Sequence, residues 1–520
     1  MRKTLRQEGL VDQRRLEGLE IGVVADEKSQ DIRAEFVRMG EQLGVQSERI
    51  TENKLDGPDF ALFLGDSLPD ADFLAKGIPF CRAQLLDDGI RVTRQENALS
   101  GQPSALQRHG LRTIVCSVAW QEVIRMTGTM LPIEIPKKFL DVCLRVDTSS
   151  VSNPRKLGDL IEIRNSDSLI IPFQVIPRQD GRGHSLLKMR LEEGSALADQ
   201  IFSYLQICWK GGDSLEPCHT ELRIPRSEGE VSGSATFSGL GGLGSWALDT
   251  VIGGLRRTNS AGRGLSLNLM DPDPEIEEHN LNRQVLYTEE DIGKEKAIVA
   301  KKKVLLVLPE ATTTSFVTPI GIPQLIGLDQ IESQDDPSFE EDDDEIFSCP
   351  EDIYSVTGGL IAQSDVLICG VDNLRDRSVL NAISSRLGIT MVNAGAQGFN
   401  GQFDLFTPGD SCMLCRYGMN ALREGARMSC QEDGDVPFSS IVTSTAIFGA
   451  LEGLALLSIL SGGSDQLSEW PTSVSWNGRT NSFRIREGGL DTFSETFSRE
   501  GPHHTHLYNR LMGLEGEGHQ

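Results

Sequence analysis

The chain has 520 residues, which is too long for a single hydrophobic core, so we expect several domains. Its hydrophobic content of 38% is sufficient for globular packing. The formal net charge of −26 argues against a general nucleic-acid binder, because such proteins need a basic surface that displaces counterions. We therefore expect no nucleic-acid partner.

Cysteine usage and hydropathy favour a cytoplasmic protein. Ten cysteines are spread along the chain and only Cys412 and Cys415 are closely spaced, which is typical of a reducing compartment rather than of a disulfide framework. The first residues, MRKTLRQEGLVDQRRLEGLE, lack the apolar segment of a signal peptide. The most apolar stretch, residues 441–460, contains Glu452 and several hydroxyl side chains, so we expect a buried helix and no membrane contact.

Residues 1–135 are predicted to form an α/β unit. Apolar runs at 19–26, 59–67 and 110–117 read as strands. The segments at 31–45 and 118–128 read as helices, which completes a βαβ rhythm. The sequence VVADEKSQD follows the first strand where a phosphate-binding unit would have a glycine-rich loop. The unit therefore has the architecture of a nucleotide-binding domain without its phosphate cradle.

Residues 136–229 are predicted to be a small bridging α+β region, with strands in 139–147, 159–177 and 184–194 and a helix at 196–209. The α/β rhythm restarts near Glu230 and continues to about residue 490. An acidic tract at 329–347 interrupts it, and such a tract is either a solvated loop or a docking surface for a basic partner. Residues 491–520 form a polar tail.

The second α/β unit contains the glycine-rich loop that the first lacks. The segment SGLGGLGSW provides Gly239, Gly241, Gly242 and Gly244, a spacing that permits a tight strand-to-helix turn and lets backbone N–H groups approach a phosphate. Taken alone, this pattern is equally compatible with a structural turn. The next strand, GLSLNLMD, ends in Asp271, and a carboxylate there can accept hydrogen bonds from the ribose of either NAD or ATP.

The residues after that strand distinguish the two nucleotides. The following segment brings together four polar or basic side chains, namely Asn280, Arg283, Gln284 and Lys296. A nicotinamide site does not need so many cationic and amide donors, whereas a triphosphate does, because charge builds on its oxygens when a phosphoryl bond breaks. The sequence therefore favours ATP over NAD.

This ordered series of motifs resembles the E1-like activating enzymes. That superfamily includes the sulfur-carrier activators of thiamine and molybdopterin synthesis and the ubiquitin-activating enzymes. The resemblance covers residues 230–485 and rests on GLGGLG (239–244), the Asp271–Asp273 pair, NLNRQ (280–284), GKEK (293–296), VDNLRDR (371–377), GAQGFNGQ (395–402) and the segment 429–457. The interval between Gly244 and Asp271 is longer than the family norm, and the interval between Asp271 and Arg283 is one residue longer than that norm. Either Asp271 or Asp273 is therefore the candidate for the ribose contact.

The resemblance implies carboxylate adenylation with ATP and Mg²⁺. It places the phosphates over the glycine loop with Arg283 and Lys296 bracing them. It assigns Mg²⁺ to Asp372, a hard oxygen ligand at the end of the strand DVLICGVD, with Asn373 and Arg377 completing the motif. Catalysis in such a site depends on positioning and charge neutralisation.

The resemblance also implies a catalytic cysteine at Cys430, in the loop 416–438. This position receives the activated acyl group in the resembling enzymes, and Arg423 and Arg427 are candidates to lower the thiol pKa. The alternative is an incidental loop cysteine. Cys369, in the middle of a predicted strand, is expected in the core.

A zinc site is a further implication of the resemblance. Cys412-Met-Leu-Cys415 has zinc-knuckle spacing, but the second Cys-x-x-Cys pair of the family is missing. Its place in the tail is taken by GPHHTH, so His503 and His506 are the candidate remaining ligands. The alternative is a decayed site with two buried thiols.

The first α/β unit lacks the glycine loop and the second contains it, and this order leads to the predicted fold class. We expect two doubly wound Rossmann-like adenylation-type units, the first degenerate and the second active, separated by a small α+β insertion. This pseudo-dimeric plan within one chain is similar to the E1 enzymes of prokaryotic ubiquitin-like conjugation systems, although a homodimer stays possible.

The implied substrate is a ubiquitin-like protein and the implied acceptor an E2-like protein. The alternatives are an E1-like adenylyltransferase acting on a sulfur carrier, a peptide or a tRNA base, a catalytically inactive scaffold, and a protein of another class, an NAD-dependent oxidoreductase. The acidic composition speaks against tRNA, and the NLNRQ and GKEK motifs speak against the oxidoreductase.

Overall fold

The computed structural model describes residue 7 and the ranges 10–53, 55–94, 100–130, 219–317, 359–408, 412–417, 440–462 and 467–486, together with four strands between 140 and 191. The chain divides into two compact units. One comprises residues 1–129 and 217–520, and the other comprises residues 130–216. Each is described by itself.

The smaller unit contains a four-stranded antiparallel sheet in the order β6-β9-β8-β7. Its strands are β6 (Leu140–Asp147), β7 (Leu160–Arg164), β8 (Ile170–Ile176) and β9 (His184–Leu191). The predicted strands in this region are thus present. The predicted helix at 196–209 lies outside the described residues.

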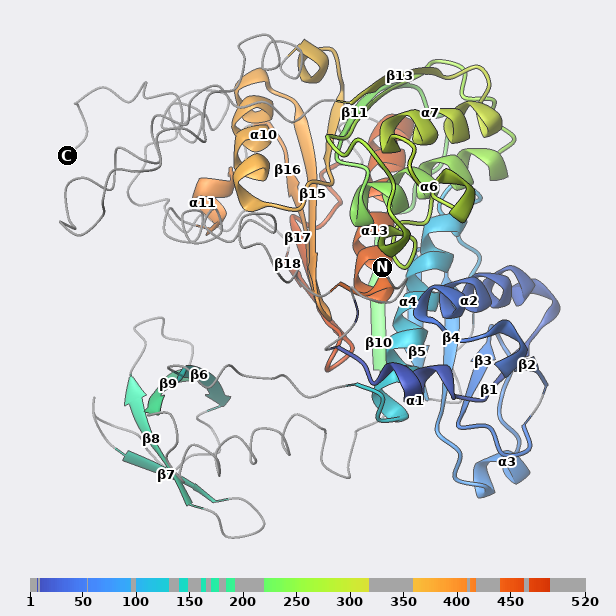
Figure 1. The fold of residues 1–520 in the computed structure, drawn as a ribbon, viewed down its shortest axis with the longest axis vertical. Helices are drawn as coiled ribbons and strands as arrows, with labels where there is room; N and C mark the ends of the chain where they lie inside the picture. Colours follow the sequence, from blue (N-terminus) through green and yellow to red (C-terminus); the bar gives the residue numbers. More distant parts are fainter. Residues whose placement is uncertain are drawn as a thin grey trace. The chain divides into compact units, whose positions relative to one another are not determined.

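The larger unit contains two sheets, and the first belongs to the N-terminal half (Figure 1). Its order is β10-β5-β4-β3-β1-β2. The strands are β1 (Ile21–Ala25), β2 (Ile50–Glu52), β3 (Phe60–Leu64), β4 (Phe80–Leu86), β5 (Gly89–Thr93) and β10 (His219–Arg223). Because β10 pairs with β5, this part of the segment that we had assigned to the bridging region completes the first sheet.

The helices of the N-terminal half correct one predicted element. They are α1 (Gln13–Glu17), α2 (Gln30–Leu43), α3 (Ala71–Ala75) and α4 (Arg108–Met126), with short 3₁₀ turns at Glu27–Ser29 and Ser47–Arg49. The strand predicted at 110–117 was wrong, because these residues form the first half of α4. A helix buried on nearly all sides reads as a continuous apolar run, which periodicity does not distinguish from a buried strand.

The second sheet has the order β13-β12-β11-β14-β15-β16-β17-β18. Its strands are β11 (Gly233–Ser238), β12 (Leu265–Met270), β13 (Thr312–Phe316), β14 (Val366–Cys369), β15 (Thr390–Gln397), β16 (Asn400–Phe406), β17 (Ser473–Asn477) and β18 (Ser482–Arg486). The helices around it are α6 (Gly242–Arg257), α7 (Lys296–Val307), α10 (Leu374–Leu387), α11 (Met413–Tyr417) and α13 (Val442–Gly462), with 3₁₀ turns at Glu278–Asn280 and Glu289–Asp291. The mixed α/β fold class that we predicted is confirmed.

The two sheets share a topology. In the first, β2-β1-β3-β4 are parallel and β5 and β10 follow antiparallel. In the second, β12-β11-β14-β15 are parallel and β16 and β17 follow antiparallel. By position, β1 therefore corresponds to β11, and β3 to β14.

Helices from both halves pack together between the sheets. Helix α13 contacts α6 and α4, and α4 also contacts α2 (Figure 1). Gly110 of α4 makes close packing possible, because a Cβ there would approach Leu454 and Thr250 to 2.7 Å. By length and composition α13 is the one helix among the described residues that could span a membrane, and it is entirely buried within the protein, as predicted for a core helix. The N-terminal half is thus joined to the second sheet through a common helical core.

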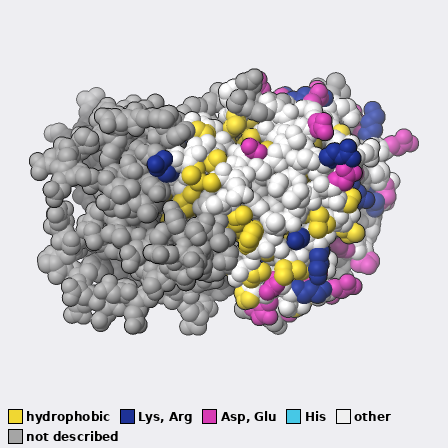
Figure 2. Space-filling model, turned by 90° about the horizontal axis from the view of Figure 1, so that it is seen from above, with side chains coloured by type: hydrophobic (Ala, Val, Ile, Leu, Met, Phe, Trp, Pro, Cys, Tyr) yellow, Lys and Arg dark blue, Asp and Glu magenta, His cyan; other side chains and the backbone are white. Residues whose placement is uncertain are grey.

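Charged side chains of both signs lie on the described part of the face drawn in Figure 2, most of them toward its rim. Basic and acidic groups lie interspersed over its described part, with hydrophobic side chains scattered between them. Charges arranged in this way favour solubility without creating one strong local field.

Candidate active site

The glycine loop connects β11 to α6 as the sequence predicted. Gly239 has a φ of 90°, which an L side chain rarely adopts, and a Cβ there would approach the carbonyl carbon of Gly370 to 2.7 Å. A Cβ on Gly244 would overlap the carbonyl oxygen of Gly239. These two glycines are therefore required by the turn itself, which presses the loop against the end of β14.

Of the remaining loop glycines, Gly241 borders open space, whereas a Cβ on Gly242 would lie 3.2 Å from Cγ2 of Thr445. Gly241 is the N-cap residue of α6, and a Cβ there would meet the Nε2 atom of Gln284 at 3.8 Å. A Cβ on Gly242 would lie 3.8 Å from Cδ of Arg283. The N-terminus of a 16-residue helix thus faces Arg283 and Gln284, and exposed N–H groups at such a terminus attract anions.

Asp271 holds this loop in place. One carboxylate oxygen accepts the N–H of Leu240 at 2.5 Å, and the other accepts the N–H of Asp273 at 2.9 Å. Burial raises the pKa of Asp271 above its ordinary value, although Lys296 and the two N–H groups partly oppose this shift. Tyr287 adds a second restraint, because its hydroxyl donates to the carbonyl oxygen of Leu240 at 2.9 Å. Both Asp271 oxygens are thus engaged by the backbone of the loop region.

Asp273 and Lys296 form an ion pair beside the loop. Lys296 is the first residue of α7, and its side chain is 4% exposed, whereas that of Asp273 is 42% exposed. Of the two candidate ribose ligands, Asp273 is therefore the more accessible. Its ion pair with Lys296 also holds this predicted phosphate ligand beside the glycine loop.

Backbone and side-chain acceptors orient Arg283. Its Nη1 atom donates to the carbonyl oxygen of His279 at 2.8 Å and to Oδ1 of Asn282 at 3.1 Å. Its own carbonyl oxygen accepts the indole N–H of Trp246, on α6, at 2.8 Å. Asn280 caps the preceding 3₁₀ turn, accepting the N–H of Glu277 at 3.1 Å. These hydrogen bonds fix the NLNRQ segment in place against α6.

Asp372 lies in the loop from β14 to α10, and it is exposed. Asn373 caps α10 by accepting the N–H of Asp376 at 2.8 Å. Arg377 is buried and donates to the carbonyl oxygen of Val371 at 2.5 Å and to Oδ1 of Asn393 at 3.0 Å. Asn373 and Arg377 therefore shape the loop, which leaves the Asp372 carboxylate available to a ligand.

The first unit has a carboxylate in place of the glycine loop. Asp26 follows β1, and its Oδ2 atom accepts the N–H of Asp66, after β3, at 3.0 Å. A Cβ on Gly65 would overlap this carboxylate, so Asp26 lies against the strand end that corresponds to Gly370. A negative charge at this point repels a phosphate, which agrees with the missing cradle.

The predicted catalytic cysteine, Cys430, lies outside the described residues. Cys369 is fully buried in β14, and burial raises its pKa to about 12. Because the thiolate is the nucleophilic form, Cys369 is unreactive at neutral pH.

The predicted zinc ligands are only partly visible. Cys412 is buried just before α11, and Cys415 lies on that helix. His503 and His506 lie outside the described residues. Within the part of the chain that is described, no group of three or more His, Cys, Asp or Glu side chains could hold a metal ion.

The donors present fit a nucleotide phosphate. The open space at Gly241, the N–H groups of α6 and the cations Arg283 and Lys296 suit an anionic chain of phosphates. The exposed carboxylate of Asp372 suits Mg²⁺, which prefers oxygen ligands. The geometry is thus that of a Rossmann-like unit whose glycine loop can accept a phosphate group.

Comparison with known proteins gives the family. Residues 233–489 match the ThiF family model, so this part of the chain is a ThiF-family domain of the E1-like adenylyltransferase type. It is similar to the sulfur carrier protein ThiS adenylyltransferase of Escherichia coli K12, with 26% identity over 43% of this chain and 70% of that protein. It is also similar to the SAMP-activating enzyme E1 of Haloferax volcanii, with 24% identity over 44% of this chain and 65% of that protein.

A third relative and a solved structure also match part of the chain. The match to the probable molybdopterin-synthase adenylyltransferase of Pyropia yezoensis is 27% identical and spans 41% of this chain and 46% of that protein. The crystal structure of E. coli MccB with ATP aligns at 18% identity with a TM-score of 0.35, over 51% of this chain and 66% of that one. Residues 1–129 thus lie outside the segment that matches the family model.

One residue of the site, Tyr287, and one residue of the first unit, Asp26, escaped the sequence analysis. Tyr287 and Asp26 carry no motif of their own, and each acts through a contact with a residue that is distant in sequence. Asp26 offered a signal, since a carboxylate directly after a strand, where the second unit has glycine, is itself unfavourable for phosphate.

Proposed function

We propose that this protein is an E1-like activating enzyme that adenylates the C-terminal carboxylate of a ubiquitin-like protein. The observation that carries the proposal is the glycine loop with Arg283 and Lys296 beside it. The loop follows β11, and the exposed Asp372 follows the neighbouring strand β14. ATP would bind over the loop. An oxygen of the substrate carboxylate attacks the α-phosphate, the bond to the β-phosphate breaks, and pyrophosphate leaves with the displaced charge. Arg283 and Lys296 neutralise that charge.

Mg²⁺ would be held by Asp372, and it supplies further neutralisation of the phosphate oxygens when bound. Asp273 has a second role in this proposal. Its accessible carboxylate holds Lys296 in the orientation that the phosphates require and is the candidate acceptor for a ribose hydroxyl. Asp271, by contrast, acts through the loop, because its oxygens are already bonded to backbone N–H groups.

The acyl group then passes to Cys430. The thiolate attacks the carbonyl carbon of the acyl adenylate, AMP leaves, and the product is a thioester that an E2-like partner accepts. The two relatives named for ThiS and for a SAMP-activating E1 support a protein substrate. The joined halves and the shared sheet topology support the pseudo-dimeric plan. We place the protein in the cytoplasm, where such partners reside.

The alternative within the family is activation of a sulfur-carrier protein without a conjugation cascade. The relative that acts on ThiS favours this reading. The two functions share the adenylation step and differ in whether the acyl group is then transferred to Cys430.

The adenylation step is tested by exchange of labelled pyrophosphate into ATP in the presence of a ubiquitin-like substrate. Lys296→Ala removes a phosphate ligand, and we expect exchange to fall about 100-fold or more. Lys302→Ala is the matched control, because it removes an exposed cation from the same helix, and exchange should be unchanged. Thermal unfolding of both variants separates catalysis from folding. Equal exchange in both variants would exclude Lys296 from the site.

We also propose that Cys412, Cys415, His503 and His506 bind one zinc ion. Elemental analysis should find about one zinc per chain, by the four-ligand rule. Truncation after Glu500 should remove this zinc and lower the unfolding temperature, because structural zinc contributes directly to folding. Full zinc content in the truncated protein would exclude the two histidines.

A further inference from the structure

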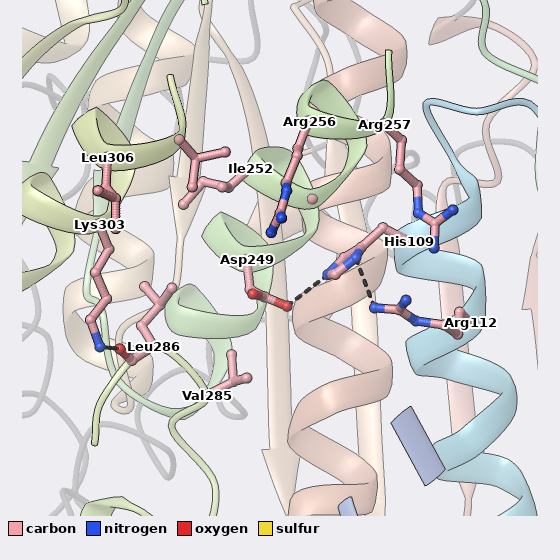
Figure 3. A pocket seen from close by; sticks show the side chains of 12 residues that line it. His109, Arg112, Asp249, Ile252, Arg256, Arg257, Val285, Leu286, Lys303 and Leu306 are labelled. Carbon is pink, nitrogen blue, oxygen red and sulfur yellow. Dashed lines mark hydrogen bonds and ion pairs between the residues drawn. The ribbon is translucent and has the colours of Figure 1, made fainter. Parts of the chain in front are cut away.

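A basic pocket lies where the N-terminal half meets the ThiF-family domain. Its volume is about 590 Å³, which is in the range of small-molecule sites. We call it the seam pocket. Its polar lining comes from α4, α6 and α7 and consists of His109, Arg112, Asp249, Arg256, Arg257 and Lys303 (Figure 3).

Four of these six side chains are cations and one is a carboxylate, in a chain whose net charge is −26. On the face drawn in Figure 2, by contrast, basic side chains lie among acidic ones. A local excess of positive charge inside a hollow marks a site for anions, because the low-dielectric walls focus the field.

His109 adds no charge to this set. Its Nε2 atom lies 2.8 Å from Oδ2 of Asp249, and its Nδ1 atom lies 2.9 Å from Nη2 of Arg112. Because a guanidinium only donates, Nδ1 must be an acceptor, and the ring is therefore neutral with its proton on Nε2. Burial raises the pKa of Asp249, but the hydrogen bond from His109 and the charges of Arg38 and Arg112 outweigh this effect and lower the pKa to about 2. Asp249 is thus the one negative group of the lining.

Acidic residues outside the pocket engage part of the cationic lining. Arg257 contacts Asp31 at 2.7 Å, and Lys303 contacts Asp291 at 2.8 Å and the carbonyl oxygen of Leu286. These contacts hold the two side chains at the wall but use only some of their donors.

Arg256 offers its guanidinium to a ligand, whereas Arg112 is partly engaged, because its Nη2 atom lies 3.5 Å from Oε2 of Glu35 and 2.9 Å from Nδ1 of His109. Nε of Arg112 is buried and has no hydrogen-bond partner among the described residues. Arg256 is exposed, and its guanidinium is directed toward the space beside Asp249 and His109 (Figure 3). A buried unpaired guanidinium nitrogen is unfavourable. Burial and the nearby Arg112 also lower the pKa of Arg257, and an anion would relieve this crowding of cations.

The opposite wall is aliphatic. Ile252, Val285 and Leu286 line it, together with Leu306 and Val307 of α7. No Phe, Tyr or Trp is among the lining residues, so the wall suits an aliphatic body rather than a stacked base.

We propose that the seam pocket binds a phosphate group carried by a small molecule, at a site separate from the glycine loop. The planar guanidinium groups of Arg112 and Arg256 match the oxygens of phosphate, and Lys303 adds a point charge. Because α4 belongs to the N-terminal half and α6 and α7 to the ThiF-family domain, the ligand bridges the two. The site is independent of the proposed adenylation reaction.

The test is calorimetric titration of the full chain with inorganic phosphate at constant ionic strength. Arg256→Ala removes an exposed side chain without disturbing the packing, and we expect affinity to fall about tenfold. Arg263→Ala is the matched control, an exposed arginine elsewhere on the surface, and should bind as wild type. Asp249→Asn removes the negative charge but keeps an acceptor for His109, so phosphate should bind severalfold more tightly.

Two further measurements fix the location and the source of the phosphate. Lys296→Ala should retain this binding event, since it alters the glycine-loop site only. Monobutyl phosphate should bind more tightly than inorganic phosphate if the natural ligand is an organic phosphate that uses the aliphatic wall, and equally if it is the free anion. Absence of phosphate binding in the wild type would overturn the proposal. Binding lost in Lys296→Ala but unchanged in Arg256→Ala would also overturn it.

Discussion

Cys430→Ala should abolish the covalent adduct between this protein and its ubiquitin-like substrate while leaving pyrophosphate exchange intact. Exchange requires only ATP, Mg²⁺ and the substrate carboxylate, so it precedes any contribution of the thiol. In the wild type, a thioester should survive denaturing electrophoresis and be released by thiol reductant. In the variant that band should be missing.

The controls for this experiment are other cysteines. Cys369→Ala should keep the adduct, because the high pKa of that buried thiol leaves it unreactive. Cys430→Ser should trap an oxyester that resists reductant but is cleaved by alkali. A thioester that persists in Cys430→Ala would move the nucleophile elsewhere. Exchange without any thioester in the wild type would favour sulfur-carrier activation, in which the adenylate passes directly to a second nucleophile.

Gly244→Ala should unfold the glycine loop. The new Cβ would overlap the carbonyl oxygen of Gly239 and lie 3.0 Å from its carbonyl carbon. Both obstacles are backbone atoms that cannot rotate away, so we expect a loss of about 2–3 kcal/mol in the free energy of unfolding and a loss of ATP binding. Urea unfolding and calorimetric titration with ATP·Mg²⁺ measure the two effects.

Gly359→Ala is the matched control. It lies in the helical turn before β14, and no described atom lies within 4 Å of its added Cβ. The substitution should leave stability unchanged or raise it by about 0.5–1 kcal/mol, because alanine is the better helix former. Equal stability of Gly244→Ala and Gly359→Ala would contradict the packing of the loop against β14.

The second α/β unit was predictable because its signals are local. Adjacent residues are enough to place three of its features: the glycine loop directly after a strand, the carboxylate after the next strand, and the asparagine before α10. The segment 441–460 was equally clear, since an apolar run of that length with one carboxylate suits a buried helix, and α13 confirms it.

The first unit was harder to read. Strand β10 is separated from its partner β5 by more than a hundred residues, and short strands such as β2 carry little pattern. Residues 110–117 were misread because Ile114 and Val115 lie in a helix that is buried between two sheets, where polar positions no longer mark a period.

The different roles of Asp271 and Asp273 could also not be assigned from the sequence. Both are carboxylates after the same strand, and composition does not distinguish them. The structure separates them through burial, because Asp271 accepts the loop N–H groups while Asp273 stays accessible beside Lys296. The seam pocket was invisible for the same reason, since its side chains come from helices far apart in the sequence.

The most direct test of the central claim is the choice of nucleotide. Purified protein should be titrated in a calorimeter with ATP·Mg²⁺ and, separately, with NAD, at constant ionic strength. Cations at Arg283 and Lys296 beside a glycine loop predict saturable ATP·Mg²⁺ binding that Lys296→Ala weakens, and no binding of NAD. Saturable binding of NAD without binding of ATP would contradict the account and return the protein to the oxidoreductase class.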